Sequence, residues 1–304
     1  MAAVELRNIT KTYGNEKLLA VNDVSFSVNK GEVFGLIGPD GAGKTSIFRI
    51  LTTLLLADSG TATVEGFDVV KEYKKIRNTV GYMPGRFSLY QDLTVEENLD
   101  FFATVFNTTV TENYNLIKDI YVQLESFKTR RAGKLSGGMK QKLALCCALI
   151  HKPTVLFLDE PTTGVDPVSR KEFWEMLKRL KEQGITILVS TPYMDEATLC
   201  ERIALIQQGE ILSIDKPGSI SSAYADQLYA VKSGKMSTLL KSLTRFDKKI
   251  NSYAFGEYAH IAVKKDQPGI EHELTLFLQG EGLHDIEVKP IEATIEDCFI
   301  KLLK

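Results

Sequence analysis

Alternating and continuous apolar runs divide the first two thirds of the chain into short elements. Alternation over 4–9 and 24–28 predicts strands with one buried face, separated by a turn at Asn15 and Glu16. Largely apolar runs at 33–37, 154–158 and 185–190 predict strands buried on both faces, as in a parallel sheet. Further strand segments are predicted at 60–69, 80–83, 203–206 and 210–214, the last two as a hairpin.

Helical periodicity accounts for most of the remaining sequence in this part. The predicted helices lie at about 46–56, 73–78, 116–127, 167–183 and 195–200. Residues 86–149 are mainly helical, and Thr94 with Glu97 has the spacing of a capping box. A further helix is predicted to begin within residues 135–141 and to end at Leu149. These elements predict an α/β protein with a parallel sheet.

A boundary is predicted near Lys216, where Pro and Gly follow in sequence. Beyond it the pattern predicts strands and helices in the order β-α-β-β-α-β, followed by one more helix. The strands are expected at 227–232, 250–255, 260–263 and 285–288, and the helices at 236–245, 269–279 and 294–303. This order predicts a ferredoxin-like α+β domain over 218–304, after a first domain over 1–217. No chemistry is visible in the second domain.

Composition and charge narrow the class of protein. The 304 residues are 44% hydrophobic and 25% charged, with a net charge of −2, which gives no reason to expect binding to nucleic acid. The longest apolar run, 143–150, is too short to span a membrane, and the N-terminus has no apolar signal region. We therefore expect a cytoplasmic protein whose membrane role, if any, depends on a partner.

Cysteine and histidine patterns point to no metal centre. The four cysteines form no C-x-x-C pair, and Cys146 and Cys147 lie in an apolar helical pattern. They are expected to be reduced core residues. The four histidines are scattered without metal-ligand spacing.

The segment 38–45 fits the G-x-x-x-x-G-K-[ST] phosphate loop and lies between a predicted strand and a predicted helix. Its glycines let several backbone N–H groups face one anion, and the helix dipole favours the same charge. Lys44 supplies a point charge to the outer phosphates, and the hydroxyl of Thr45 can ligate Mg²⁺. A chance match by a glycine-rich turn is less consistent with the strand before and the helix after.

Two carboxylates, Asp159 and Glu160, follow the buried strand at 154–158. At the carboxyl end of a parallel strand, Asp159 is expected beside the phosphate loop, where it can hold Mg²⁺ directly or through water. Glu160 can orient or deprotonate an attacking water. The alternative, a solvated strand end, is disfavoured by the preceding apolar run and the following Pro. An exposed Tyr13 between the first two predicted strands can stack on an adenine ring. The alternative is that this ring only packs within a β-turn.

Together these segments resemble the nucleotide-binding subunit of an ATP-binding cassette (ABC) transporter, of the drug-exporter type that serves ABC-2 permeases. Residues 38–45 match the phosphate loop, 135–139 the family signature, 156–161 the Mg²⁺ strand, and 164–166 the loop that follows. The ending 293–303 resembles that of drug-exporter cassettes. The resemblance covers about 1–217. It implies a P-loop NTPase (RecA-like) core with an antiparallel β subdomain and a helical signature subdomain at about 86–149.

The resemblance implies ATP and Mg²⁺ as ligands, with Glu160 catalytic and Thr45 and Asp159 at the metal. The nucleotide-binding residues it implies are Tyr13, Gly38, Pro39, Asp40, Gly41, Ala42, Gly43, Lys44, Thr45, Ser46 and Asp159. The signature residues Leu135, Ser136, Gly137 and Gly138 would act on ATP held by a second cassette subunit, whether identical or different. The implied partner is a multi-span permease, which would hold the protein at the inner face of the cell membrane.

Two positions depart from the family pattern. Gly85 stands where the family usually carries Gln, and Pro192 stands where it usually carries a His that contacts the γ-phosphate. Proline has neither a side-chain donor nor an N–H. Asp40 replaces a common Asn and can support the same turn. The sequence therefore predicts good ATP binding, weakened hydrolysis at the chain's own phosphate loop and an intact signature half.

Three functions remain to be compared. The chain can be an ATP-driven exporter subunit, or a hydrolysis-deficient ATP-binding half that completes the site of a partner cassette. A soluble cassette protein acting on ribosomes or DNA is less consistent with the absence of paired cassettes, coiled insertions and basic surfaces. For the exporter, the departures leave two readings: a weakened site, or a remodelled loop in which Thr191 or Tyr193 replaces the missing contact.

Overall fold

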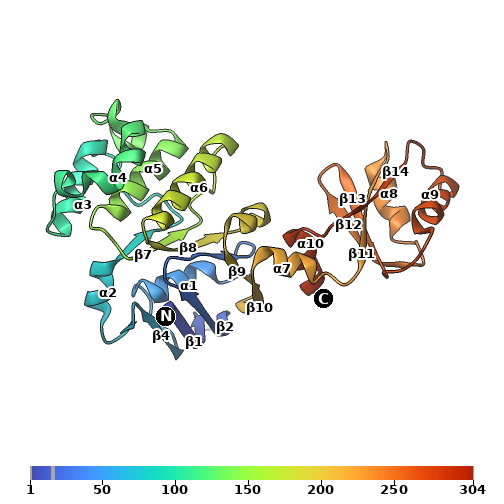
Figure 1. The fold of residues 1–304 in the computed structure, drawn as a ribbon, viewed down its shortest axis with the longest axis horizontal. Coiled ribbons are helices and arrows are strands. Elements are labelled where there is room, and N and C mark those ends of the chain that lie inside the picture. The colour runs from blue at the N-terminus through green and yellow to red at the C-terminus, as the bar shows by residue number, and fades with distance from the viewer. Residues whose placement is uncertain (1, 15–17, 304) are drawn as a thin grey trace. The chain divides into compact units, whose positions relative to one another are not determined.

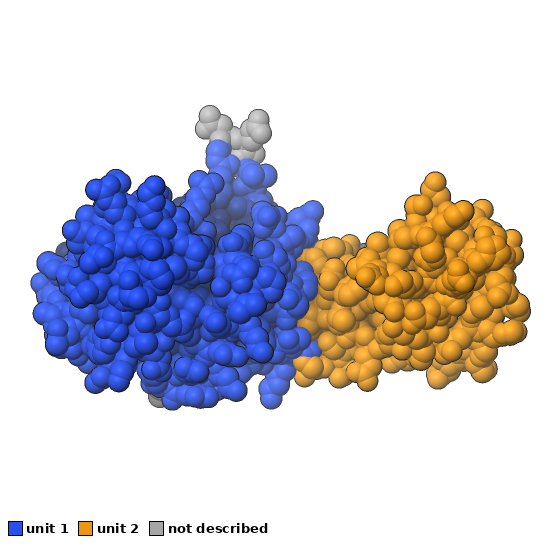
Figure 2. Space-filling view, turned by 90° about the horizontal axis from the view of Figure 1, so that it is seen from above, with its two compact units in different colours: residues 1–217 blue, residues 218–304 orange. Residues whose placement is uncertain are grey.

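The computed structural model describes residues 2–14 and 18–303, so the predicted turn at Asn15 and Glu16 lies outside the described residues. The chain divides into two compact units, 1–217 and 218–304, which Figure 2 colours separately. No helix within the described residues is both long and apolar enough to cross a membrane. Each unit is built around its own sheets and core.

Figure 1 labels the elements of the first unit. Its strands are β1 (Ala2–Tyr13), β2 (Leu18–Asn29), β3 (Val33–Ile37), β4 (Ser59–Val64), β5 (Phe67–Asp68), β6 (Val80–Met83), β7 (Val155–Asp159), β8 (Thr186–Thr191), β9 (Arg202–Gln207) and β10 (Glu210–Asp215). Its helices are α1 (Lys44–Leu51), α2 (Tyr73–Thr79), α3 (Val95–Val105), α4 (Val110–Glu125), α5 (Gly137–Leu149) and α6 (Pro167–Glu182), with 3₁₀ segments η1 (Ala132–Lys134) and η2 (Met194–Leu199).

The central sheet has the strand order β10-β9-β3-β8-β7-β6, and all its pairs except β9–β10 are parallel. Every residue of β3, β7 and β8 is buried, as the apolar runs predict. Parallel strands end at a common edge, so the segments after β3, β7 and β8 come together there. This edge carries the phosphate loop, the two carboxylates and the turn that contains Pro192.

The antiparallel part is a second sheet with the order β2-β1-β4-β5, as predicted. Its inner face and the central sheet share one apolar core with α1. Phe26 of β2 stacks on Phe34 of β3 with ring centroids 5.3 Å apart, and Phe48 of α1 meets Phe157 of β7 edge-on at 5.9 Å. Burying such rings fixes α1 against the strands that flank the phosphate loop.

Helices α3, α4 and α5 form the helical part, and the predicted capping box is confirmed. The Thr94 side chain accepts from the Glu97 N–H, and the Glu97 carboxylate accepts from the Thr94 N–H. The predicted start of the next helix at 116 is wrong, because Thr109 caps a helix that already begins at Val110.

The helix after the phosphate loop also differs from its predicted range of about 46–56. It begins at Lys44 and ends at Leu51. Its end is set by Thr53, whose φ of +64° breaks the helix, and the Leu54 N–H then donates to Arg49 O at 2.7 Å. The apolar residues that follow therefore belong to a loop, where Leu54 is 58% exposed.

The second unit contains β11 (Gln227–Lys232), β12 (Lys249–Phe255), β13 (Tyr258–Val263), β14 (Glu287–Ile291), α8 (Met236–Leu243), α9 (Ile270–Gly280) and α10 (Ile295–Leu302). The sheet order β12-β13-β11-β14 is antiparallel throughout, which is the split β-α-β topology of ferredoxin-like domains. Two details differ from the sequence pattern: α7 (Pro217–Ser222) lies at the predicted boundary, and β14 is shifted to include Pro290. Pro290 is tolerated because β14 is an edge strand.

Asp297 of α10 is fully buried and holds the C-terminal helix on this sheet. Its Oδ1 accepts from Tyr253 Oη at 2.6 Å and lies 2.6 Å from His260 Nδ1. Its Oδ2 accepts from the N–H and hydroxyl of Thr294, both at 2.7 Å. Burial raises the pKa of Asp297, but these hydrogen bonds outweigh it and hold the pKa at about 2. Thr294 and Asp297, which lie in the segment that resembles the ending of drug-exporter cassettes, thus have a structural role in this chain.

Replacing Asp297 with Asn is expected to lower the free energy of unfolding of the second unit by about 2–3 kcal/mol at pH 7. Because the folded pKa of about 2 lies below the ordinary 3.8, the stabilisation is present at neutral pH and is lost as the pH falls from about 4 to about 2. Pulse-labelling hydrogen exchange of α10 and β13 across a urea series should measure the difference in unfolding free energy between the wild type and the variant. This difference should be about 1 kcal/mol smaller at pH 3 than at pH 7. Equal midpoints for the two proteins at pH 7 would contradict this role.

Candidate functional site

Glycines 38 and 43 allow the phosphate loop to pass close to neighbouring backbone. A Cβ on Gly38 would lie 2.2 Å from Ile206 O, and one on Gly43 would lie 2.3 Å from Ala20 O. Gly43 also has a φ of +103°, in the left-handed region that glycine adopts without strain. The loop is tied to the end of β8 because the Gly38 N–H donates to Thr191 O at 3.2 Å. Its shape is therefore fixed by the fold.

Lys44 is the cation of this loop and is only 3% exposed. Its Nζ donates to Gly38 O at 2.8 Å and to Pro39 O at 2.9 Å, so the side chain folds back over the loop. The same Nζ lies 3.0 Å from Glu160 Oε1. The structure thus brings together the two charged residues that the sequence assigned to the phosphates and to catalysis.

The N-terminus of α1 offers hydrogen-bond donors to an anion. The first intrahelical bond runs from the Ile47 N–H to Gly43 O, so the N–H groups of residues 44–46 precede it. Asp40 and Gly41 are exposed at the tip of the loop, and the Ala42 N–H closes a turn on Pro39 O. The Tyr13 hydroxyl lies 3.1 Å from Ser46 Oγ, which places this aromatic ring beside the helix start.

Asp159 is buried at the end of β7, and Ser190 orients it. The Ser190 hydroxyl donates to Asp159 Oδ1 at 2.6 Å and accepts from the Glu160 N–H at 3.0 Å. Burial, and then the charge of Asp159, raise the pKa of Tyr82 to about 12, so that phenol stays neutral. A carboxylate and the Thr45 hydroxyl are hard oxygen donors of the kind that suits Mg²⁺. The residues present therefore fit this ion.

Glu160 adopts a backbone conformation that is uncommon for glutamate. Its φ is +51°, in the left-handed region, and its N–H donates to Ser190 O at 3.0 Å. Such outliers persist only where the surroundings fix them, and they are frequent at functional sites. The backbone turns here so that the side chain reaches Lys44 at the phosphate loop.

Both positions that depart from the family pattern lie next to this site. A Cβ on Gly85 would be 3.0 Å from Asp159 O and 3.8 Å from Glu160 Cβ. Pro192 directly follows Thr191, whose carbonyl binds the phosphate loop. A glutamine side chain at position 85 would therefore lie near the two carboxylates, and a histidine side chain at position 192 would lie near the phosphate loop.

Glu196 organises the turn around Pro192, although no motif in the sequence points to it. Its carboxylate is 1% exposed and accepts from the hydroxyls of Thr191 at 2.6 Å and Thr162 at 2.8 Å. The Thr191 hydroxyl is thus committed to Glu196, and the Tyr193 ring packs against Arg170 at 4.3 Å. For either residue to replace the missing contact, as the remodelled-loop hypothesis requires, the Thr191 hydroxyl would have to leave Glu196 or the Tyr193 side chain would have to reach the phosphates.

The signature residues form the start of α5. Ser136 caps the helix by accepting from the Met139 N–H at 3.3 Å, and Ser136 and Gly137 are exposed while Leu135 is buried. A Cβ on Gly138 would lie 2.8 Å from Ser169 Oγ, so α6 packs close to this helix start. The result is an outward-facing helix N-terminus, a geometry that favours anions.

The fold and this site define an ATP-binding cassette of the P-loop NTPase class. The ABC transporter family profile matches residues 21–163. The chain is 36% identical over 307 residues to Nod factor export ATP-binding protein I of Burkholderia lata, covering 99% of this chain and 97% of that protein. This chain therefore belongs to the ABC transporter family.

Other relatives agree with this assignment. The chain is 37% identical over 308 residues to the probable multidrug ABC transporter ATP-binding protein YbhF of Escherichia coli (strain K12), covering 99% of this chain and 52% of that protein. It thus spans about half the length of that relative. A solved dimeric ATP-binding cassette, in a post-hydrolysis state with ADP and phosphate, matches 70% of this chain and 98% of its own, at 28% identity and a TM-score of 0.64.

Proposed function

We propose that this chain is the ATP-binding and ATP-hydrolysing subunit of an exporter and that it drives a membrane permease. The observation that carries this proposal is the 3.0 Å pair of Lys44 and Glu160, which joins the phosphate loop to the strand of the Mg²⁺ carboxylate. The names of the two relatives, a Nod factor export protein and a probable multidrug transporter protein, support the transport role. The proposed place of action is the cytoplasmic face of the membrane.

The proposed chemistry assigns one task to each group. Backbone N–H groups of the loop and Lys44 bind the β- and γ-phosphates, and Tyr13 lies against the adenine. Thr45 and Asp159 would hold Mg²⁺, which neutralises charge on the phosphates when bound. Glu160 accepts the proton of the attacking water as that water approaches the γ-phosphate.

The signature supports a shared site formed by two cassettes. The exposed start of α5 offers N–H groups and the Ser136 hydroxyl, a second anion site besides the phosphate loop. We propose that it binds the γ-phosphate of ATP held by a second cassette, which is either another copy or a different subunit. Hydrolysis would then be coupled to the opening and closing of the pair.

A groove of about 450 Å³ between the helical part and the segment formed by α2 and β6 supports a permease contact. Apolar residues dominate its lining, including Met83, Leu89, Phe102 and Phe106, while Arg77 and Arg86 supply positive charge. The lining contains no carboxylate. We propose that a short amphipathic segment of the permease docks here. Because Gly85 adjoins the groove and the carboxylates, this contact would reach the hydrolysis site.

The second candidate is a hydrolysis-deficient half that completes a partner's site, and it is favoured by Gly85 and Pro192. Introducing Gly85→Gln with Pro192→His should raise the steady-state ATPase rate at least about tenfold, because one restored contact in the transition state contributes roughly 1.5–3 kcal/mol. ATP affinity should change little. Phosphate release, measured with and without a partner cassette, tests this.

The matched control is Gly85→Ala with Pro192→Ala. It adds the same Cβ, 3.0 Å from Asp159 O, and restores the N–H, but it supplies neither amide nor imidazole. If Thr191 or Tyr193 had taken over the contact, the Gln and His variant would be neutral or slower, and Thr191→Val or Tyr193→Phe would lower a substantial wild-type rate. A wild-type homodimer that turns over several times per second would exclude the degenerate half, since that is an ordinary enzyme rate.

A further inference from the structure

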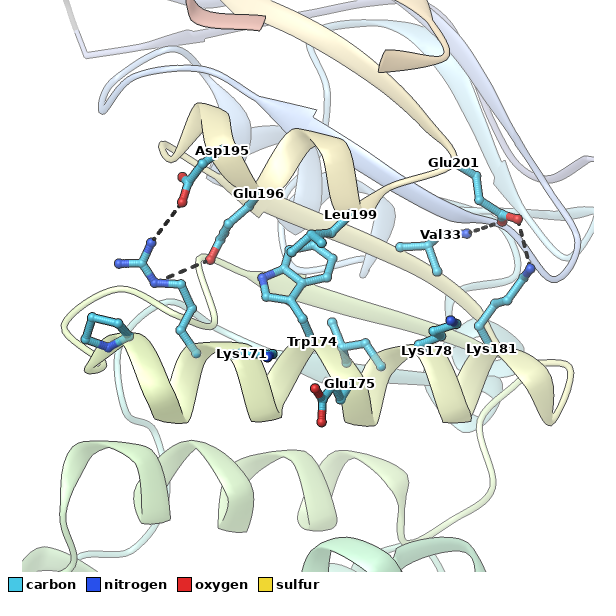
Figure 3. A pocket seen from close by; sticks show the side chains of 13 residues that line it. Val33, Lys171, Trp174, Glu175, Lys178, Lys181, Asp195, Glu196, Leu199 and Glu201 are labelled. Carbon is cyan, nitrogen blue, oxygen red and sulfur yellow. Dashed lines mark hydrogen bonds and ion pairs between the residues drawn. The ribbon is translucent and has the colours of Figure 1, made fainter. Parts of the chain in front are cut away.

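A second pocket in the first unit, of about 700 Å³, lies between α6 and the segment formed by η2 and the start of β9 (Figure 3). Trp174 and Leu177 of α6 and Val33 form its apolar floor. Leu199 forms the opposite wall and is 54% exposed. None of its lining residues belongs to the phosphate loop or the signature. The volume is typical of small-molecule sites.

Two N–H groups at this pocket make no hydrogen bond. Trp174 is 6% exposed, and its Nε1 is buried without a partner, while Nε of Arg170 lies 3.8 Å from Glu196 Oε1, an ion pair too long for a hydrogen bond. The two residues are four positions apart on α6 and so share one face of the helix. Buried polar atoms are nearly always satisfied, so the unsatisfied N–H of Trp174 requires an explanation. An acceptor that enters from the pocket would satisfy it after a small side-chain adjustment.

Ion pairs close both ends of the pocket and limit the length of an occupant. Arg170 lies 3.5 Å from Asp195 at one end, and Lys181 lies 2.8 Å from Glu201 at the other (Figure 3). Eleven helical residues separate the two cations along α6, which is about 16 Å. The space of about 700 Å³ between these ends lies within the range of small-molecule sites.

The lining carries four cations and four carboxylates, so its formal charge is balanced. Arg170 pairs with both Asp195 and Glu196, and Lys181 pairs with Glu201. Among the described residues, Lys171 and Lys178 form no ion pair, and Glu175 is the one unpaired carboxylate of the lining. The exposed Lys171 and Lys178 thus outnumber Glu175 at the rim of the pocket, whereas the other charges of the lining are paired.

We propose that this pocket binds a small, ring-containing apolar molecule with one hydrogen-bond acceptor. Its ring system packs on Trp174, Leu177 and Leu199, and its acceptor oxygen takes the hydrogen bond of the buried Trp174 N–H. Binding at this site does not depend on the proposed ATPase function.

The pocket is also linked to the hydrolysis site, and this regulatory step rests on the proposed function. Glu196 lines the pocket and accepts from the hydroxyls of Thr191, next to Pro192, and Thr162, which leads to the loop before α6. A ligand wedged between α6 and η2 would shift this carboxylate and with it the Pro192 turn. Occupancy should therefore change the ATPase rate without competing with ATP.

The single tryptophan of the chain is the reporter for this site. The probe is 8-anilinonaphthalene-1-sulfonate, an aromatic anion that accepts energy from tryptophan. In the full-length protein, one bound probe per chain should quench most Trp174 emission at saturation, and excess MgATP should leave the titration unchanged. Leu199→Arg, which fills the pocket, should abolish the quenching, whereas Leu276→Arg, an equally exposed leucine at 54% on α9, should not alter it. Lys178→Glu, on the exposed side of α6, should weaken binding several-fold with the fold intact.

Three results would overturn the proposal. They are no saturable quenching, equal quenching in the Leu199→Arg and wild-type proteins, or displacement of the probe by MgATP, which would place it at the phosphate loop. Saturable binding that leaves an active ATPase unchanged would overturn the regulatory step alone. If the chain proves inactive as an ATPase, the proposed function fails while the binding titration still decides whether this site exists.

Discussion

Glu160→Gln is expected to lower the ATP hydrolysis rate by about 10²–10⁴-fold, the contribution typical of a positioned general base. The amide keeps the shape of the side chain but cannot take the proton of the attacking water. The substitution also removes the charge 3.0 Å from Lys44, so that cation is freed for the phosphates. ATP affinity should be unchanged or tighter, which separates a defect in chemistry from a defect in binding.

Single-turnover phosphate release and equilibrium ATP binding should be measured on the same preparation. Glu182→Gln is a matched control, because Glu182 is exposed at the end of α6 and forms no described ion pair. A rate within twofold of the wild type in Glu160→Gln would remove Glu160 from catalysis. That result would move the role of general base to another group or to the partner subunit.

Lys44→Ala is expected to weaken ATP binding by about 10–150-fold, since a charge-assisted contact is worth roughly 1.5–3 kcal/mol. The effect should be largest for ATP and smaller for AMP, because this cation lies over the part of the loop that receives the outer phosphates. Calorimetry with each nucleotide measures both affinities.

Lys74→Ala on α2 serves as the control, because Lys74 is exposed and lies outside the loop. Circular dichroism should confirm that the Lys44 variant is folded, since its side chain is buried. An unchanged ATP affinity in a folded Lys44→Ala protein would contradict the assignment of this loop.

The sequence pattern predicted the strands of the central sheet closely, because residues buried on both faces leave a continuous apolar run, as in 33–37. Element ends were harder to predict. The apolar residues after Leu51 extended the helical pattern although Thr53 ends α1 with a positive φ. The last strand was expected at 285–288, yet β14 continues to Ile291, and Pro290 within it pairs with Tyr229 at the sheet edge. In both places a single backbone conformation or an edge position outweighed the local pattern.

The phosphate loop and the two carboxylates were predictable because their spacing is local. Ser190 and Glu196 were not, because Ser190 meets Asp159 across 31 positions of sequence and Glu196 meets Thr162 across 34. One signal was present: Ser190 and Thr191 are polar residues that end an otherwise apolar strand next to the strand of Asp159. Polar residues at the carboxyl end of a buried parallel strand therefore deserve inclusion in a candidate site.

The shared site is tested most directly by the mass of the Glu160→Gln protein in light scattering, with and without MgATP. We expect an ATP-dependent dimer, formed by this chain with a second copy or with its partner cassette. The reason is that the signature of one subunit would bind the ATP held by the other. Adding Ser136→Arg, which places a bulky side chain at the exposed start of α5, should abolish the pair while ATP affinity stays the same. Monomers at every ATP concentration, with and without the partner cassette, or a pair that is insensitive to Ser136→Arg, would contradict the account.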